Sequence, residues 1–349
     1  MPATPPPSTV PPRRLKAESP EDLLAVLPYL MGYQPDESLV MAVLGDRVIE
    51  VCVRVDLDEP VDEVADRFHD IAETNGSGGV LLLAYSADPD RADRMLLPMI
   101  DHLEGFGIIE ALYTDGSRWW SRVCDDDCCP PEGIAYDVDN NRLAAEAVFH
   151  GMTRQSGRDA LERAVQGPPP EALEALTEVT EEILTGVFEQ TRDQRCRQIR
   201  CWILDYVERR LREDTVAVDD RELITLACLV IDIPVRDTAW ALIRREDAWV
   251  HVELWQQVLT RAVTALQVPT LGLLGMAGWI SGQGTLQVCC IERARELDPD
   301  YSLIDILDDI NRRALPPSFW ESIRPSMQDA LEEDLTGPQD GGDALGQLD

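Results

Sequence analysis

The sequence predicts an α/β domain, formed by a mixed sheet with flanking helices, followed by an all-α domain. In the first 140 residues, short apolar and β-branched runs alternate with helical patterns. From residue 141 onward the apolar residues follow helical periods with no convincing strand. The two ends, residues 1–17 and 326–349, have the proline-rich and acidic, glycine-rich compositions of disordered segments. We therefore expect the α/β domain at 18–150 and the helical domain at 151–325.

The first expected element is a helix that begins after Ser19 and ends at Gly32. Ser19 is a favourable N-cap, and Pro20 suits the first helical position. Glu21 and Asp22 then place negative charge beside the positive end of the helix dipole. These signals predict a helix that leads directly into the sheet.

Strands and helices then alternate. Residues 38–57 predict two antiparallel strands joined by a turn at Gly45-Asp46. Helices are expected at 60–75 and 88–104, and between them the continuous apolar run "VLLLAY" is typical of a strand buried on both faces. Residues 107–123 predict one or two further strands. Such alternation implies at least one parallel strand pair.

Within the helical half, residues 271–301 carry a spacing similar to that of the tetratricopeptide repeat, in which small residues let two antiparallel helices approach closely. The matching positions are Leu274, Gly275, Gly282, Ile291, Ala294 and Pro299, and the departures are Leu271, Gly278 and Gln287. We therefore predict a tetratricopeptide-like helical domain in which this pair stacks on the preceding helices. The pair would serve either as structural packing or as a peptide-binding groove.

The composition excludes several classes of function. The chain carries 65 acidic and 31 basic residues, a formal charge of −34, which repels nucleic acid and anionic membranes. Lys16 is the single lysine and lies in the leader, so a P-loop or a Schiff-base mechanism is excluded. Without a membrane span or secretory signal, we expect a cytoplasmic protein with a protein partner and mostly reduced cysteines.

Polar residues follow the predicted strands, where ligands usually bind in α/β sheets. Asp56 follows the second strand, Tyr85 and Ser86 follow the third, and Thr114 and Asp115 follow the fourth. The sequence thus predicts a ligand pocket formed by Asp56, Asp115, Arg118, Trp119, Trp120 and Glu132. In the alternative interpretation, Trp119 and Trp120 point to opposite faces of a strand. Asp115 then only caps the turn that precedes this strand.

The stretch "RVCDDDCCPPEG", residues 122–133, places Cys124, Cys128 and Cys129 beside three aspartates. Three thiolates with a fourth ligand from elsewhere could hold zinc. A reversible Cys124–Cys128 disulfide is also feasible. The neighbouring carboxylates disfavour a reactive thiolate, and in the third alternative Pro130 and Pro131 simply make the turn rigid around buried thiols.

Several motifs together indicate a family. "SPEDLLAVLPYLMGYQPDESLVMAVL", "DGSRWWS", "CCPPEG", "ARELDPDYSL" and "LPPSFW" resemble the actinobacterial domain of unknown function 4192 family over residues 18 to 320. The resemblance implies a bacterial cytoplasmic protein, but it does not indicate any activity.

Three functions follow from these observations. We expect a non-catalytic protein-interaction or regulatory module, because catalytic motifs are missing and half of the chain is helical. The first alternative is an enzyme that binds a metal or small ligand near Asp115 and the Cys124 loop. The second alternative is a thiol redox sensor.

Overall fold

Six strands form one mixed sheet in the order β2-β1-β3-β4-β5-β6. The computed structural model describes residues 15–46, 48–76, 78–124, 130–149, 154, 157–213 and 215–336, with side chains described as far as residue 329. The strands are β1 (Ser38–Gly45), β2 (Val48–Asp56), β3 (Val80–Tyr85), β4 (Ile108–Thr114), β5 (Arg118–Ser121) and β6 (Ile134–Ala135). The pair β3 and β4 is parallel and the other pairs are antiparallel. The predicted mixed sheet with a parallel pair is confirmed.

The hairpin between β1 and β2 differs from the prediction by one residue. Gly45 pairs with Val48 at the end of the ladder, so the turn begins at Asp46 rather than at Gly45. Asp46 takes up a positive φ of 47°, a conformation that aspartate tolerates better than most residues. Gly45 therefore still belongs to the strand.

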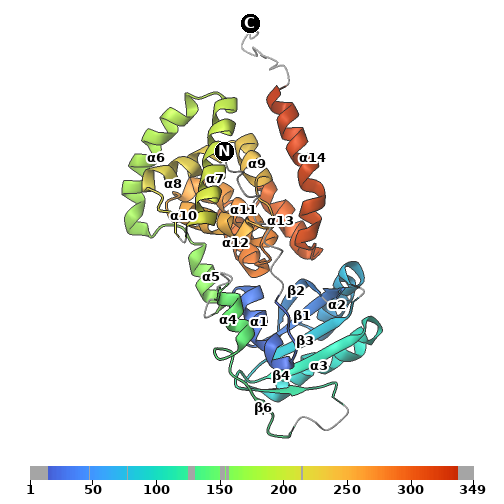
Figure 1. Ribbon diagram of the computed structural model, residues 1–349. Coiled ribbons are helices and arrows are strands. Elements are labelled where there is room, and N and C mark those ends of the chain that lie inside the picture. The colour runs from blue at the N-terminus through green and yellow to red at the C-terminus, as the bar shows by residue number, and fades with distance from the viewer. Residues whose placement is uncertain are drawn as a thin grey trace, which may run out of the picture.

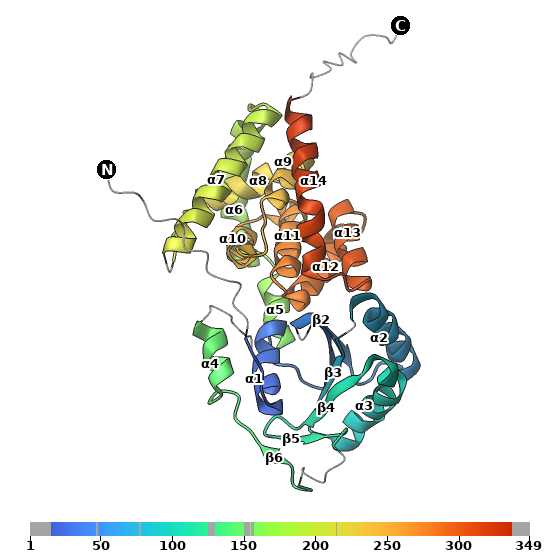
Figure 2. The same ribbon diagram turned by 45° about the vertical axis from the view of Figure 1, so that its right-hand side comes forward.

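Helices cover both faces of the sheet. They are α1 (Pro20–Met31), α2 (Val61–Asn75), α3 (Pro89–Leu103) with the short turn η1 (Glu104–Phe106), and α4 (Arg142–Phe149). Helices α2 and α3 lie on one face, whereas α1 and α4 lie on the other (Figure 2). The predicted start of α1 is confirmed: the Asp22 N–H donates to Ser19 Oγ, and Gly32 ends the helix with a φ of 80°.

The strand pleat divides the core between these two faces. In β3, Leu82 and Ala84 pack toward α2 and α3, while Leu81, Leu83 and Tyr85 pack toward α1. All six residues of β3 are buried, as the continuous apolar run predicts. Each large apolar side chain buried in this way contributes about 1.5–3 kcal/mol to stability.

After α4, every further element in the described part of the chain is helical. The helices are α5 (Arg158–Ala164), η2 (Pro170–Ala172), α6 (Leu173–Phe188), α7 (Arg192–Arg212), α8 (Asp220–Leu229), α9 (Ile233–Ala241), α10 (Ala248–Leu259), α11 (Thr264–Ile280), α12 (Gly284–Leu297), α13 (Ser302–Arg312) and α14 (Pro317–Thr336). Helices α6 to α14 gather beyond one edge of the α/β part, and α5 lies between the two parts (Figure 1). None of the helices in the described ranges is both long and apolar enough to cross a membrane.

Helix α11 is the centre of the helical part. Its residues from Leu266 to Ile280 are all buried, and α12 and α13 pack against it. A Cβ atom at Gly275 would lie 2.8 Å from Leu307 Cδ1 and 3.3 Å from Cys290 Cβ. The absence of a side chain at Gly275 therefore allows the close helix approach that its spacing predicts.

Helix α14 continues past residue 325, where composition predicts the acidic tail to begin. Met327 packs against the main core, and the Gln328 side-chain amide donates to the Ala241 carbonyl oxygen at 3.0 Å. Trp320 is fully buried and donates its Nε1 proton to Ile243 O at 2.9 Å. These contacts stabilise a helix that the polar composition of the segment does not indicate.

Candidate functional site

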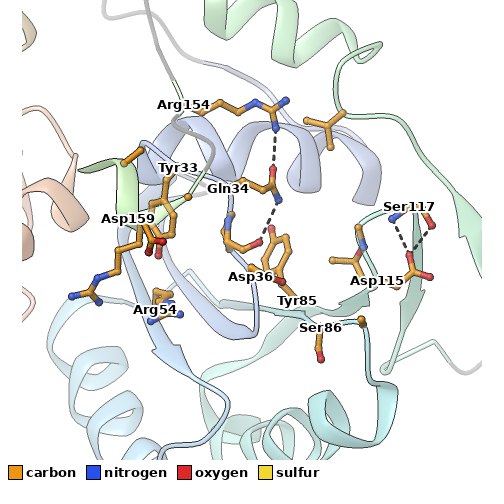
Figure 3. A pocket seen from close by; sticks show the side chains of 18 of the residues that line it. Tyr33, Gln34, Asp36, Arg54, Tyr85, Ser86, Asp115, Ser117, Arg154 and Asp159 are labelled. Atoms are coloured by element: carbon orange, nitrogen blue, oxygen red, sulfur yellow. Dashed lines mark hydrogen bonds between the residues drawn. The ribbon is translucent and has the colours of Figure 1, made fainter. Parts of the chain in front are cut away.

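A cavity of about 1210 Å³ lies at one edge of the sheet, and Figure 3 shows side chains that line it. Its lining comes from residues 33–36, which precede β1, from the ends of β2, β3 and β4, and from residues 136–139. Residues of α5 and Glu292 of α12 complete it. The cavity therefore lies where the α/β part meets the helical part, a common position for ligand sites.

Strand pairing explains why polar groups converge at this edge. Tyr85 at the end of β3 pairs with Thr114 at the end of β4. Ser38 at the start of β1 pairs with both Tyr85 and Asp56, because β1 is antiparallel to its neighbours. The carboxyl ends of three strands thus meet at one edge, which is where α/β sheets bind ligands.

At one end of the cavity, the lining includes the phenol of Tyr33 and the guanidinium groups of Arg54 and Arg158. Tyr33 is 2% exposed, and the Thr285 side chain lies close enough to its hydroxyl to lower its pKa. Desolvation raises the pKa of Tyr33, and the positive charges of Arg54 and Arg158 partly offset that rise, so both arginines act on this phenol. Arg54 Nη2 pairs with Asp56 Oδ1 at 2.6 Å, whereas its Nε is buried and has no partner among the described residues.

Tyr85 lies between the two ends of the cavity (Figure 3). It is 3% exposed, and its hydroxyl has no hydrogen-bond partner among the described residues. Desolvation raises the pKa of Tyr85 well above its ordinary value, and the nearby Tyr136, Cys52 and Tyr33 raise it further, so the phenol is neutral. A buried hydroxyl without a partner costs about 1–3 kcal/mol, which a bound ligand or water would offset.

Asp115 and Ser117 lie at the other end (Figure 3). Asp115 Oδ1 accepts hydrogen bonds from Ser117 N at 2.8 Å, Ser117 Oγ at 2.9 Å and Arg118 N at 2.7 Å. Partial burial acts to raise the pKa of Asp115, but these hydrogen bonds outweigh it and lower the pKa. Asp115 therefore caps the turn between β4 and β5 and remains ionised.

Arg154 and Arg158, which come from the segment around α5, line one side of the cavity. We call this side of the cavity, with α5, the roof. Arg154 donates to Gln34 Oε1 at 2.9 Å, and it also pairs with Asp139. Arg158 on α5 pairs with Glu292 on α12 at 2.6 Å. Desolvation acts to lower the pKa of Arg158, but the bond to Glu292 outweighs it and the pKa is raised. The roof is thus bound to both parts of the chain.

Glu37 fills the position beside the first turn of α3. Its carboxylate accepts hydrogen bonds from Ser86 Oγ at 3.0 Å, Ala87 N at 3.3 Å and Arg91 Nη1 at 2.5 Å. Glu37 also has a positive φ of 41°. In dinucleotide-binding folds a phosphate lies at such a helix start, whereas here the protein supplies its own anion.

The sequence-predicted pocket residues separate into two groups. Asp56 and Asp115 line the cavity, but Arg118, Trp119, Trp120 and Glu132 are not part of its lining. The Arg118 side chain instead joins β5 to the residues just before β6, since Nη1 donates to Gly133 O at 2.9 Å and to Glu132 O at 3.1 Å. The Glu132 side chain is exposed.

The two tryptophans lie on opposite faces of the sheet, as the pleat predicts. Trp119 is buried on the α1 face and donates its Nε1 proton to Glu21 Oε1 at 3.2 Å. Trp120 stacks on Tyr113 on the opposite face, with ring centroids 5.0 Å apart. Both side chains therefore have structural roles in the sheet.

Sequence reasoning missed most of the polar residues that converge on the cavity. Tyr33, Arg54, Arg154 and Arg158 come from a loop, the interior of β2, an isolated linker residue and α5. Arg54 carries the one detectable signal, a charged residue inside the apolar run "VCVRV". The others reach the cavity through tertiary packing.

The cysteine loop lies largely outside the described residues, which do not include Cys128 and Cys129. Cys124 takes part in a disulfide. The other cysteines in the described ranges are free, namely Cys52, Cys196, Cys201, Cys228, Cys289 and Cys290. No group of three metal-ligating side chains occurs within those ranges.

These features define an α/β protein with a helical C-terminal part and a ligand-sized cavity between them. The chain belongs to the family described as domain of unknown function (DUF4192), whose model matches residues 20–318. The match extends over both the sheet and the helices. No curated protein and no solved structure gives a significant match.

Proposed function

We propose that the protein binds a small polar molecule in the cavity between the sheet and α5. One observation carries the proposal: Arg54 Nε and the Tyr85 hydroxyl are buried among the lining residues and have no hydrogen-bond partner in the described part of the chain. Native proteins satisfy nearly all buried polar groups, so such a cluster indicates a missing partner. Its position at the carboxyl edge of the parallel strands supports the same function.

Binding of a ligand would engage both parts of the chain. Arg54 and Tyr85 belong to the sheet, Arg158 belongs to α5, and Glu292 belongs to α12. A molecule that contacts all of them replaces bonds that now hold the roof in place. We therefore propose a regulatory role, in which occupancy of the cavity changes how firmly the two parts are joined.

Native mass spectrometry of the full chain, incubated with a deproteinised cell extract, tests this function. The expected result is a small-molecule adduct that the wild-type chain retains and Tyr85→Phe loses. Tyr113→Phe is the matched control, because Tyr113 lies in the neighbouring strand on the opposite face of the sheet. An adduct that persists in Tyr85→Phe, or no adduct at all, would contradict the proposal.

We also propose that the helical part binds a protein partner, in the manner of a tetratricopeptide-like domain. The close packing at Gly275 supports the helix-pair geometry. Leu204 and Leu211, which lie on one face of α7, are 47% and 53% exposed and supply an apolar contact surface. The free thiols favour a cytoplasmic location, and the family resemblance favours an actinobacterial source.

Chemical crosslinking in cell extract tests the partner proposal. We expect a crosslinked protein that disappears when Leu204 and Leu211 are both replaced by glutamate. Leu97→Glu is the control, since Leu97 is similarly exposed, at 45%, but lies on α3. The same crosslinked proteins in both variants would exclude this surface.

A further inference from the structure

The charges that line the cavity disfavour an anionic ligand. Acidic side chains outnumber arginines by seven to four among the described lining residues. Three of those arginines, Arg54, Arg154 and Arg158, already pair with carboxylates. A phosphate or carboxylate would therefore enter a field of like charge, and Glu37 already fills the position beside the start of α3.

The buried Arg54 Nε, which has no hydrogen-bond partner among the described residues, disfavours a cationic ligand. Arg54 Nε–H is a hydrogen-bond donor only, and the neutral phenols of Tyr33 and Tyr85 each carry a donor proton. An ammonium group has three donors and no acceptor. A polyamine would pair with the carboxylates but would leave the Arg54 donor unsatisfied.

A hydroxyl group satisfies both requirements, because it donates one hydrogen bond and accepts others. Its oxygen can accept from Arg54 Nε or from a phenol, and its proton can be donated to a carboxylate such as Asp36 or Asp159. Both carboxylates line the cavity and are exposed. Figure 3 draws Asp159 at the same end of the cavity as Tyr33 and Arg54, so this end carries both donors and acceptors.

The size of the cavity adds a further constraint. Its volume of about 1210 Å³ exceeds the range of roughly 300–1,000 Å³ that is usual for small-molecule sites. The space between Tyr33 at one end and Asp115 at the other can therefore hold more than one ring. The aromatic rings of Tyr33, Tyr85 and Tyr136 supply apolar contact for the ring carbons of a ligand.

We propose that the ligand is a neutral, polyhydroxylated molecule of the saccharide class, with room for at least two sugar rings. This inference rests on the proposed ligand-binding function and specifies its chemistry. Buried donors, exposed carboxylates and excess negative charge together match the alternating hydroxyl groups of a neutral sugar.

Saturation-transfer NMR with the full chain tests the ligand class. The neutral probes are glucose, galactose, maltose, cellobiose and trehalose. The charged probes are glucuronate, glucose 6-phosphate and glucosamine, which keep the sugar ring of glucose and add a negative or positive charge. We expect saturation transfer to a neutral disaccharide and at least about tenfold weaker binding of every charged probe.

The Tyr85→Phe and Tyr113→Phe variants test whether the sugar binds in this cavity. Tyr85→Phe is expected to weaken binding of the neutral probe about fivefold, the equivalent of one hydrogen bond, whereas Tyr113→Phe leaves it unchanged. No transfer to any neutral probe, or binding of a charged probe as tightly, would overturn the inference. If the extract nevertheless yields a Tyr85-dependent adduct, the binding function stands and only the saccharide class fails.

Discussion

The guanidinium of Arg158 on α5 binds the carboxylate of Glu292 on α12 at 2.6 Å, directly at the rim of the cavity. Arg158 also pairs with Glu162 within α5 at 2.9 Å. This ion pair joins the short helix that roofs the cavity to the helical core. The strength with which the roof is held therefore depends on a contact that a ligand can reach.

Replacement of Glu292 by glutamine should loosen the roof at small cost to global stability. The two side chains are 30% and 51% exposed, so the pair contributes no more than about 1 kcal/mol to the free energy of unfolding. Amide hydrogen exchange of α5 should nevertheless increase. Glu182→Gln, which breaks the exposed pair with Arg221 far from the cavity, should leave exchange in α5 unchanged. Equal exchange in all three proteins would show that Glu292 does not hold α5.

Tyr85→Phe should stabilise the ligand-free protein by about 1 kcal/mol, because it removes the cost of burying a hydroxyl without a hydrogen-bond partner. Removal of a buried hydroxyl that has a partner usually costs about 1 kcal/mol, but the Tyr85 hydroxyl has none among the described residues. Urea unfolding of the purified variant measures this difference. A loss of stability of about 1 kcal/mol would mean that the hydroxyl has a partner in the free protein.

Gly275→Ala should destabilise the protein by about 1–3 kcal/mol, the usual effect of overpacking. The new methyl group would approach Leu307 Cδ1 to 2.8 Å at the contact of α11 with α13. Gly186→Ala in α6 is the control, because its Cβ would have no neighbour within 4 Å. That change should stabilise by about 0.5–1 kcal/mol, since alanine favours helix interiors. Thermal unfolding distinguishes the two, and equal effects would contradict the close approach at Gly275.

Asp115→Asn should lower stability near neutral pH but not at acidic pH. The pKa of Asp115 is lowered in the folded protein, so its ionised form stabilises the fold above the ordinary carboxyl pKa. This contribution is lost as the pH falls through the lowered pKa. Because the side chain is exposed, we expect less than about 1 kcal/mol. Urea unfolding of both proteins across this pH range measures the difference, which should disappear at the acidic end.

Thiol titration of the unfolded protein tests the state of Cys124. Because Cys124 forms a disulfide, two fewer of the nine cysteines should react before reduction than after it. Cys124→Ser should abolish this difference, whereas Cys201→Ser, at an exposed free cysteine, should preserve it. Equal titration before and after reduction would show that Cys124 is reduced in solution.

The sequence predicts the sheet and its polar edge because both depend on local patterns. Asp56 and Asp115 follow strands directly, and the pleat alone places Trp119 and Trp120 on opposite faces. The cavity roof could not be predicted in this way. Arg158 reaches the cavity only because α5 packs beside α12, and no local spacing specifies a contact with Glu292, 134 residues away.

The same distinction explains the continuation of α14. Composition predicts disorder from residue 326, because the segment is polar and acidic. The contact that stabilises the helix there is the bond from Gln328 to Ala241 O, 87 residues earlier in the chain. Long-range contacts of this kind are specified by the fold rather than by nearby residues.

Native mass spectrometry of the Tyr85→Phe and Tyr113→Phe variants, measured side by side, tests whether a small molecule binds at the carboxyl edge of the sheet. We expect an adduct on the wild-type chain and on Tyr113→Phe that is lost or strongly reduced on Tyr85→Phe. Equal adducts on both variants, or none on the wild-type chain, would contradict a ligand site at the carboxyl edge of the sheet.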